Sequence, residues 1–183
     1  LAILGLILTS IACGSSENSV VVNQSSEEEA PSQQEPTDLP DVGTTRSNPA
    51  PVGSEVIVDD LALKIISITR PADDIIKAGN MFNTEPESDQ EYVLIELQIT
   101  CKKSMDDQCN ISSYWNISLI GSSGIAYDPE WLVTGVEGLL ESVKFYGDAT
   151  VSGYIPFIIK QSDTNLVLVY EPLLFGDTVY LAV

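Results

Sequence analysis

Three cysteines carry the most reactive side chains of this 183-residue chain. Cys101 and Cys109 flank the polar segment KKSMDDQ, so they are placed to close a small loop at the end of an apolar stretch. A disulfide between them would stabilise the folded chain by about 2 to 3 kcal/mol through loop closure. The alternative is a pair of reduced, buried thiols. If the disulfide forms, the odd cysteine, Cys13, is left free for another chemistry.

Cys13 lies where the sequence changes from apolar to polar. Residues 1–12, LAILGLILTSIA, carry no charge, but they are too few to span a bilayer core, which needs about 20. Together with the cysteine, Ile11 and Ala12 resemble the end of a bacterial lipoprotein signal, although Ser10 stands where leucine is usual. We interpret residues 1–12 as a signal-peptide remnant, truncated at its front, and Cys13 as a lipidation site. An uncleaved membrane anchor and a buried strand or helix are the alternatives.

The charge and the missing histidine argue against several classes of function. The chain has 27 acidic and 8 basic residues, a formal net charge of −19, so it cannot attract a phosphate backbone. It has no histidine, which is the commonest general base and neutral metal ligand. Two thiols alone supply too few soft ligands for zinc. We therefore expect no nucleic-acid partner, no cofactor, no bound metal and no enzyme activity.

Residues 13–52 are predicted to comprise the lipidated cysteine and a disordered, acidic linker. The segment is rich in Ser, Glu, Gln and Pro, as in EEEAPSQQEPTDLPD, and offers almost nothing to bury. Such a composition cannot offset the entropy that is lost on ordering. The Val-Val-Val run at 20–22 is too short to change this expectation. An acidic tail that binds a partner or cations is the alternative.

Residues 53–183 are predicted to fold as an all-β sandwich of about seven or more strands. Short β-branched and aromatic runs, several with apolar and polar residues in alternation, are separated by Gly, Pro and Asp turns. The segments 71–90 and 130–148 are predicted as loops, with room for one helical turn near 73–78 and a short helix near 137–143. The expected strands cover residues 55–58, 61–70, 92–101, 115–121, 125–127, 150–159, 165–171 and 178–183.

Two tryptophans and several acidic pairs are the remaining candidate binding residues. Trp115 and Trp131 are expected in the core, as most strand tryptophans are, and exposed binding residues are the alternative. The acidic pairs lack the spacing and central glycine of an EF-hand loop, so turns and solubilising charge explain them better than calcium ligands do. These pairs are Asp59–Asp60, Asp73–Asp74, Asp106–Asp107 and Asp128 with Glu130.

The order of several short motifs carries a family resemblance over residues 53–183. The motifs are GSEVIVDDLALKIISI, EYVLIELQITC, GIAYDP, ATVSGYIPFII and NLVLVYEPLLFGDTVYLAV. They resemble a family of bacterial domains of unknown function described as telokin-like, or immunoprotective-extracellular-protein-like. The resemblance implies an immunoglobulin-like β-sandwich, commonly carried by secreted or lipid-anchored proteins, and it brings no catalytic residues. The chain departs from the family in the segments 71–90 and 130–148, which leaves the loops at one end of the sandwich unassigned.

These observations favour a lipid-anchored extracytoplasmic binding or structural module at the envelope of a bacterium. Lipid on Cys13 would hold it to a membrane, and loops or an edge strand would contact an envelope protein or glycan. The alternatives are a carboxylate-dependent envelope hydrolase and a calcium-dependent adhesion domain. Two buried acids with raised pKa in one cleft would favour the hydrolase.

Overall fold

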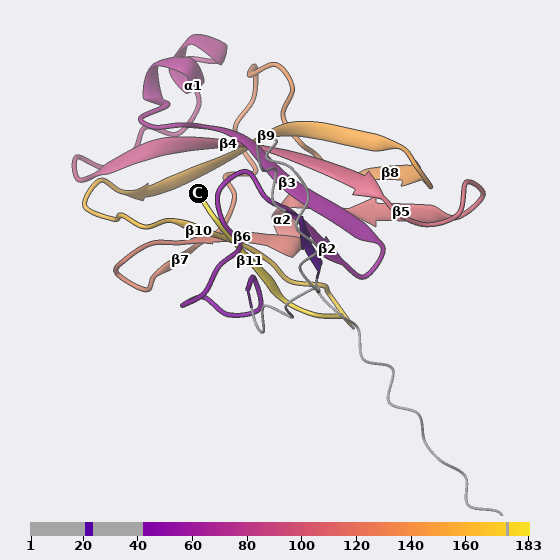
Figure 1. Cartoon of the computed structure of the whole chain (residues 1–183). Helices are drawn as coiled ribbons and strands as arrows, with labels where there is room; N and C mark the ends of the chain where they lie inside the picture. The colour runs from indigo at the N-terminus through magenta and orange to yellow at the C-terminus, as the bar shows by residue number, and fades with distance from the viewer. Residues whose placement is uncertain (1–20, 24–41, 175) are drawn as a thin grey trace, which may run out of the picture.

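The computed structural model of the chain describes residues 21–23, 42–174 and 176–183. The signal-peptide remnant, residues 1–12, and the predicted lipidation site, Cys13, lie outside these residues. Figure 1 shows two antiparallel sheets packed face to face, with a two-stranded sheet at one end. The expected all-β sandwich is therefore confirmed. In the part of the chain that the structure describes, neither helix is long and apolar enough to cross a membrane.

The strands of each sheet are all antiparallel to their neighbours. The first sheet has the order β1-β2-β3-β4-β9, the second has the order β11-β10-β6-β7, and the third pairs β5 with β8. The helices are α1 (Asp73–Gly79) and α2 (Ser113–Asn116). The strands are β1 (Val21–Asn23), β2 (Glu55–Val58), β3 (Leu61–Thr69), β4 (Gln90–Cys101), β5 (Gln108–Ile111), β6 (Ile117–Ile120), β7 (Ala126–Tyr127), β8 (Val143–Tyr146), β9 (Thr150–Lys160), β10 (Val167–Tyr170) and β11 (Val179–Ala182).

The main core lies between the two larger sheets. Alternate residues of β4 point into it, because successive side chains of a strand face opposite sides of the sheet. The opposing sheet contributes Leu119, Leu168 and Leu181. The inward residues of β4, all almost completely buried, are Val93, Ile95, Leu97, Ile99 and Cys101.

β4 also buries residues on its outer face, but only near its beginning. Tyr92 and Leu94 pack there with Ala72, Ile76 and Val133 in a second, smaller core. Further along the same face the alternate residues of β4 are polar and partly exposed. Consequently α1 and the loop that carries Val133 cover the apolar beginning of the strand, and Figure 1 shows them side by side at that end of the sheet.

The segment 42–52, which we expected to be linker, packs on the second sheet. Ala50 is fully buried; its N–H donates to the Tyr180 carbonyl and its own carbonyl accepts from Ala182, both at 2.8 Å. Gly43 accepts a further hydrogen bond from the N–H of Tyr180 at 2.8 Å. Composition did not reveal this packing, because backbone hydrogen bonds rather than a run of apolar side chains hold the segment.

The other differences from the expected elements are local. Residues 21–23 pair with β2, whereas the Val-Val-Val run at 20–22 was expected to leave the linker disordered. Residues 115–116 belong to α2 rather than to a strand, since the Asn116 side chain accepts the N–H of Ser112 and closes a helical turn. The helix considered near 137–143 is absent, whereas the turn expected near 73–78 is present as α1. The short strands β5 and β8 were not expected.

Candidate binding surface

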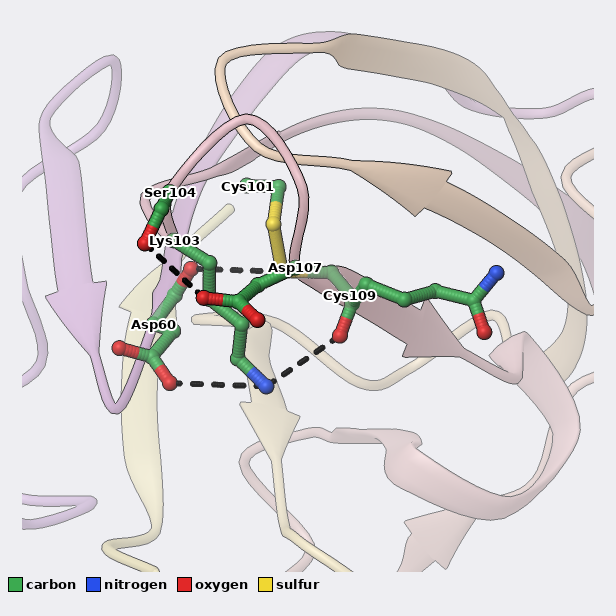
Figure 2. Close-up of a disulfide and its surroundings, with 7 residues drawn as sticks. Asp60, Cys101, Lys103, Ser104, Asp107 and Cys109 are labelled. Atoms are coloured by element: carbon green, nitrogen blue, oxygen red, sulfur yellow. Dashed lines mark hydrogen bonds and ion pairs between the residues drawn. A yellow bond between two sulfur atoms is a disulfide. The ribbon is translucent and has the colours of Figure 1, made fainter.

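Cys101 and Cys109 are joined by a disulfide, the pairing that the cysteine count predicts. Both residues are buried, and Figure 2 shows the polar loop that they close. Within that loop the Ser104 hydroxyl donates to the Asp107 carboxylate at 2.9 Å, and Lys103 donates to a backbone carbonyl of β5 at 3.2 Å. The disulfide therefore fixes the end of β4 to β5, which is a structural role.

Asp163 is a carboxylate buried to 2 % exposure at the turn 121–124. It accepts hydrogen bonds from the hydroxyls of Tyr127 at 2.5 Å and Ser123 at 2.7 Å, from the N–H of Ser123 at 2.7 Å and from Ser122 at 3.2 Å. Burial alone would raise the pKa of this carboxyl, but these donors outweigh it and lower the pKa to about 2. Its hydrogen bonds hold the turn and the strand β7 together.

Within the described ranges, two carboxylates have a raised pKa, and they lie apart. Burial, then Asp177 and Asp60, raise the pKa of Asp59, and burial, then Asp128, raises the pKa of Glu130. Asp59 follows β2 and lies near the Cys101 end of β4. The N–H of Glu130 instead donates to the carbonyl of Pro156, and Pro156 is the cross-strand partner of Leu94 in β4. Along β4, Leu94 and Cys101 are about 23 Å apart at 3.3 Å per residue.

Among the described residues, no three side chains of the types that bind metals are grouped as a metal site. This finding covers the acidic pairs that raised the calcium alternative. Asp59–Asp60 and Asp106–Asp107 lie in two turns near the Cys101 end of β4, Asp73–Asp74 begin α1, and Asp128 with Glu130 lie in the segment that is bonded to Pro156 of β9.

Two loops far apart in sequence are bonded to each other beside α1. The Asn80 side-chain amide donates to the Thr134 hydroxyl at 2.8 Å, and the Asn83 amide donates to the Thr134 carbonyl at 3.0 Å. The backbones of the two loops touch at Gly79 and Gly135. A Cβ on either glycine would overlap the other residue, so this close approach requires glycine at both positions. These contacts fix one loop against the other.

The joined loops present four large apolar side chains to water. They are Met81 and Phe82 on one loop and Trp131 and Leu132 on the other, and we call them the apolar tip. Phe82 is 86 % exposed and Trp131 is 67 % exposed, whereas Val133 takes the inward position of its loop.

The expectation that the two tryptophans are buried was therefore wrong. Trp115 is also 73 % exposed, since it lies in α2 and not in a strand. The sequence signal for the tip is a pair of adjacent large apolar residues inside each polar loop, Met-Phe at 81–82 and Trp-Leu at 131–132.

A cleft of about 450 Å³ opens beside the apolar tip, and Met81 belongs to both. Its wall also carries four side-chain amides, from Asn80, Asn83, Gln90 and Gln161. We call it the acidic cleft after its charged lining residues, which are Asp73, Asp74, Lys77, Glu85 and Glu87.

Tyr92 forms part of the cleft lining and holds the loop above it in place. Its hydroxyl donates to the Thr84 carbonyl at 2.9 Å. Burial, followed by the charges of Glu130 and Asp73, raises the pKa of Tyr92 to about 12. The phenol therefore stays protonated at neutral pH and keeps this hydrogen bond.

Residues 50–180 match the family model of a domain of unknown function, DUF4352. The chain belongs to this family. The DUF4352 range contains the disulfide, the apolar tip and the acidic cleft. No curated protein matches the sequence. The resemblance to a bacterial domain family of unknown function is thus confirmed.

Solved bacterial structures show the same fold at low sequence identity. The yjhA protein of Bacillus subtilis is 13 % identical with a TM-score of 0.51, over 72 % of this chain and 98 % of that one. The ycdA protein of Bacillus subtilis, a predicted lipoprotein, is 18 % identical with a TM-score of 0.52, over 70 % of this chain and 38 % of that one. The secreted protein MPT63 of Mycobacterium tuberculosis is 9 % identical with a TM-score of 0.50, over 74 % of this chain and 98 % of that one.

Proposed function

We propose that this DUF4352 protein is a lipid-anchored extracytoplasmic module that binds an envelope component through the apolar tip. The observation that carries the proposal is the exposure of Phe82 and Trp131 on two loops that are bonded together. Burying a large apolar side chain is worth about 1.5 to 3 kcal/mol, so a partner that covers both rings gains several kcal/mol. Because the loops are already held in place, little ordering entropy opposes that gain.

Three observations support the location. Cys13 follows an apolar, uncharged segment as a lipidated cysteine does. The disulfide between Cys101 and Cys109 is of the kind that persists in oxidising compartments outside the cytoplasm. Among proteins of the same fold, one is described as a predicted lipoprotein and another as secreted.

The carboxylates support binding better than hydrolysis. A carboxylate hydrolase needs two acids at one cleft with pKa values pushed apart. Here the acids with raised pKa, Asp59 and Glu130, lie on different parts of the sandwich. The buried acid, Asp163, has a lowered pKa, and its oxygens accept hydrogen bonds from three neighbouring residues.

Photocrosslinking on intact cells tests the binding surface. A photoreactive residue at Phe82 or at Trp131 should give the same adduct, since one partner covers both positions. Met105 is the matched control, because it is 75 % exposed and lies in the disulfide loop at the other end of β4. The same adduct from Met105, or labelling of bulk lipid and wall alone, would contradict the proposal.

Mass spectrometry of the membrane fraction tests the anchor separately. The N-terminal residue of the mature chain should be an acylated Cys13. The Cys13→Ser variant should be released from the membrane or keep its signal segment. A variant that stays in the membrane without any acylation would indicate an uncleaved anchor instead.

A further inference from the structure

The surroundings of the apolar tip are strongly negative. Residues 71–90 and 128–141, which carry the tip, hold nine acidic residues and one basic residue, Lys77. Apolar surface ringed by one sign of charge favours a partner that presents apolar groups together with the opposite sign. The acidic residues are Asp73, Asp74, Glu85, Glu87, Asp89, Asp128, Glu130, Glu137 and Glu141.

The nearby cations do not neutralise this charge. Lys77 pairs with Glu85 at 3.4 Å, but both side chains are largely exposed, and such pairs contribute little. Arg70 is held by Glu91 at 2.6 Å, so its charge is already matched. The acidic cleft therefore keeps an excess of carboxylates in a concave space, where the negative potential is strongest.

The cleft and the tip are continuous. Met81 lines the cleft and is one of the four tip residues. A short peptide segment can therefore place a charged side chain in the cleft while its neighbours cover the tip. The side-chain oxygens of Asn83 and Gln90 already accept hydrogen bonds from the N–H groups of Thr134 and Glu87. The carboxylates of the lining are therefore the acceptors offered to a guanidinium or an ammonium group.

We infer that the partner is a protein segment that combines Lys or Arg with apolar side chains. The cation enters the acidic cleft and the apolar side chains pack on Phe82 and Trp131. This inference rests on the proposed function and names its partner chemistry. An anionic lipid surface is repelled by the same carboxylates, and a neutral glycan has no positive charge for them to attract.

Model peptides test the inference with the full chain in a neutral detergent. The probes are three fluorescent 12-residue peptides that alternate Lys with Leu, Glu with Leu, or Lys with Ser. Fluorescence anisotropy should show that the Lys-Leu peptide binds at least about tenfold more tightly than the other two, because only it supplies both chemistries. Raising the salt concentration should weaken this binding.

Two variants and a matched control locate the binding. Phe82→Ser and the double variant Glu85→Gln with Glu87→Gln should each weaken binding of the Lys-Leu peptide by about five- to tenfold. The control, Asp106→Asn with Glu171→Gln, removes the same charge from exposed positions outside the two loops and should leave the affinity unchanged. These sites distinguish local recognition from net charge.

Each of the other outcomes overturns the inference. Equal losses in the glutamate variant and its control would mean non-specific attraction to an acidic protein. An unchanged affinity in the glutamate variant, or tight binding of the Glu-Leu peptide, would mean that charge is not recognised. Binding of anionic vesicles or soluble wall glycan in place of the peptide would assign the tip to a lipid or a sugar. In all these cases crosslinking from Phe82 still decides the proposed function on its own.

Discussion

Asn83 and Thr134 hydrogen-bond to each other in both directions. The Asn83 side-chain amide donates to the Thr134 carbonyl at 3.0 Å, and the Thr134 N–H donates to the Asn83 side-chain oxygen at 3.0 Å. The same amide also donates to the carbonyl of Ile76 in α1 at 2.9 Å. One side chain therefore ties the helix and both loops of the apolar tip together.

Asn83→Ala should loosen the apolar tip without unfolding the sandwich. The loss of three partly exposed hydrogen bonds should cost about 1 to 2 kcal/mol of unfolding free energy. Amide hydrogen exchange should accelerate at residues 80–84 and 131–135 and stay unchanged in β4. Asn110→Ala, an exposed substitution on β5, is the control. Equal protection in the two variants would mean that this side chain does not hold the loops.

Gly135→Ala should cost more than Gly53→Ala, although both glycines have φ near +77°. An added Cβ costs about 1 to 2 kcal/mol at either site from the backbone conformation alone. At Gly135 it would also overlap the Gly79 carbonyl, whereas around Gly53 there is open space. Urea unfolding measures the difference. Equal losses would show that the two loops separate readily.

Reduction of the disulfide should lower the stability of the domain by about 2 to 3 kcal/mol, through the larger entropy of the unfolded chain. Equilibrium urea unfolding of the natural chain should shift to lower urea concentration when a reductant is present. The Cys101→Ala, Cys109→Ala double variant should be less stable and insensitive to the reductant. If the reductant leaves the natural chain unchanged, the bond contributes nothing to stability.

Asp163 should make stability fall at acidic pH. Its folded pKa, about 2, lies below the usual aspartate pKa of 3.8, so its contribution is present above pH 3.8 and is lost as the pH falls towards 2. Asp163→Asn should therefore be less stable than the natural chain at pH 6, and the difference should shrink between pH 4 and pH 2. A difference that is constant with pH would mean that the carboxyl does not titrate in this way.

The strands were predictable because alternation along a strand records which face is buried. β4 shows this most clearly, since Val93, Ile95 and Leu97 alternate with residues of the outer face. The disulfide was predictable from spacing and compartment. The strand β5 was missed because its four residues, QCNI, include two polar residues, whereas the equally short β2, EVIV, is rich in β-branched residues.

The binding surface could not be derived from the sequence in the same way. Met81 and Trp131 are 50 positions apart and are brought together by polar side chains in two irregular loops. Propensity treats Trp131 as a core residue, yet the neighbouring Val133 fills the inward position. Local patterns do not show which member of such an apolar run faces the core.

The pairing of β1 with β2 bears on the distance between the proposed membrane anchor and the folded domain. On the proposed anchor at Cys13, only eight residue steps separate the lipid from Val21, a span of at most about 28 Å. If β1 detaches, the fixed point becomes Val42, 29 steps from the anchor, and the span grows to about 100 Å. If Cys13 is lipidated, the pairing of β1 with β2 therefore limits how far the domain can lie from the membrane. Without this pairing, the limit would be more than three times as large.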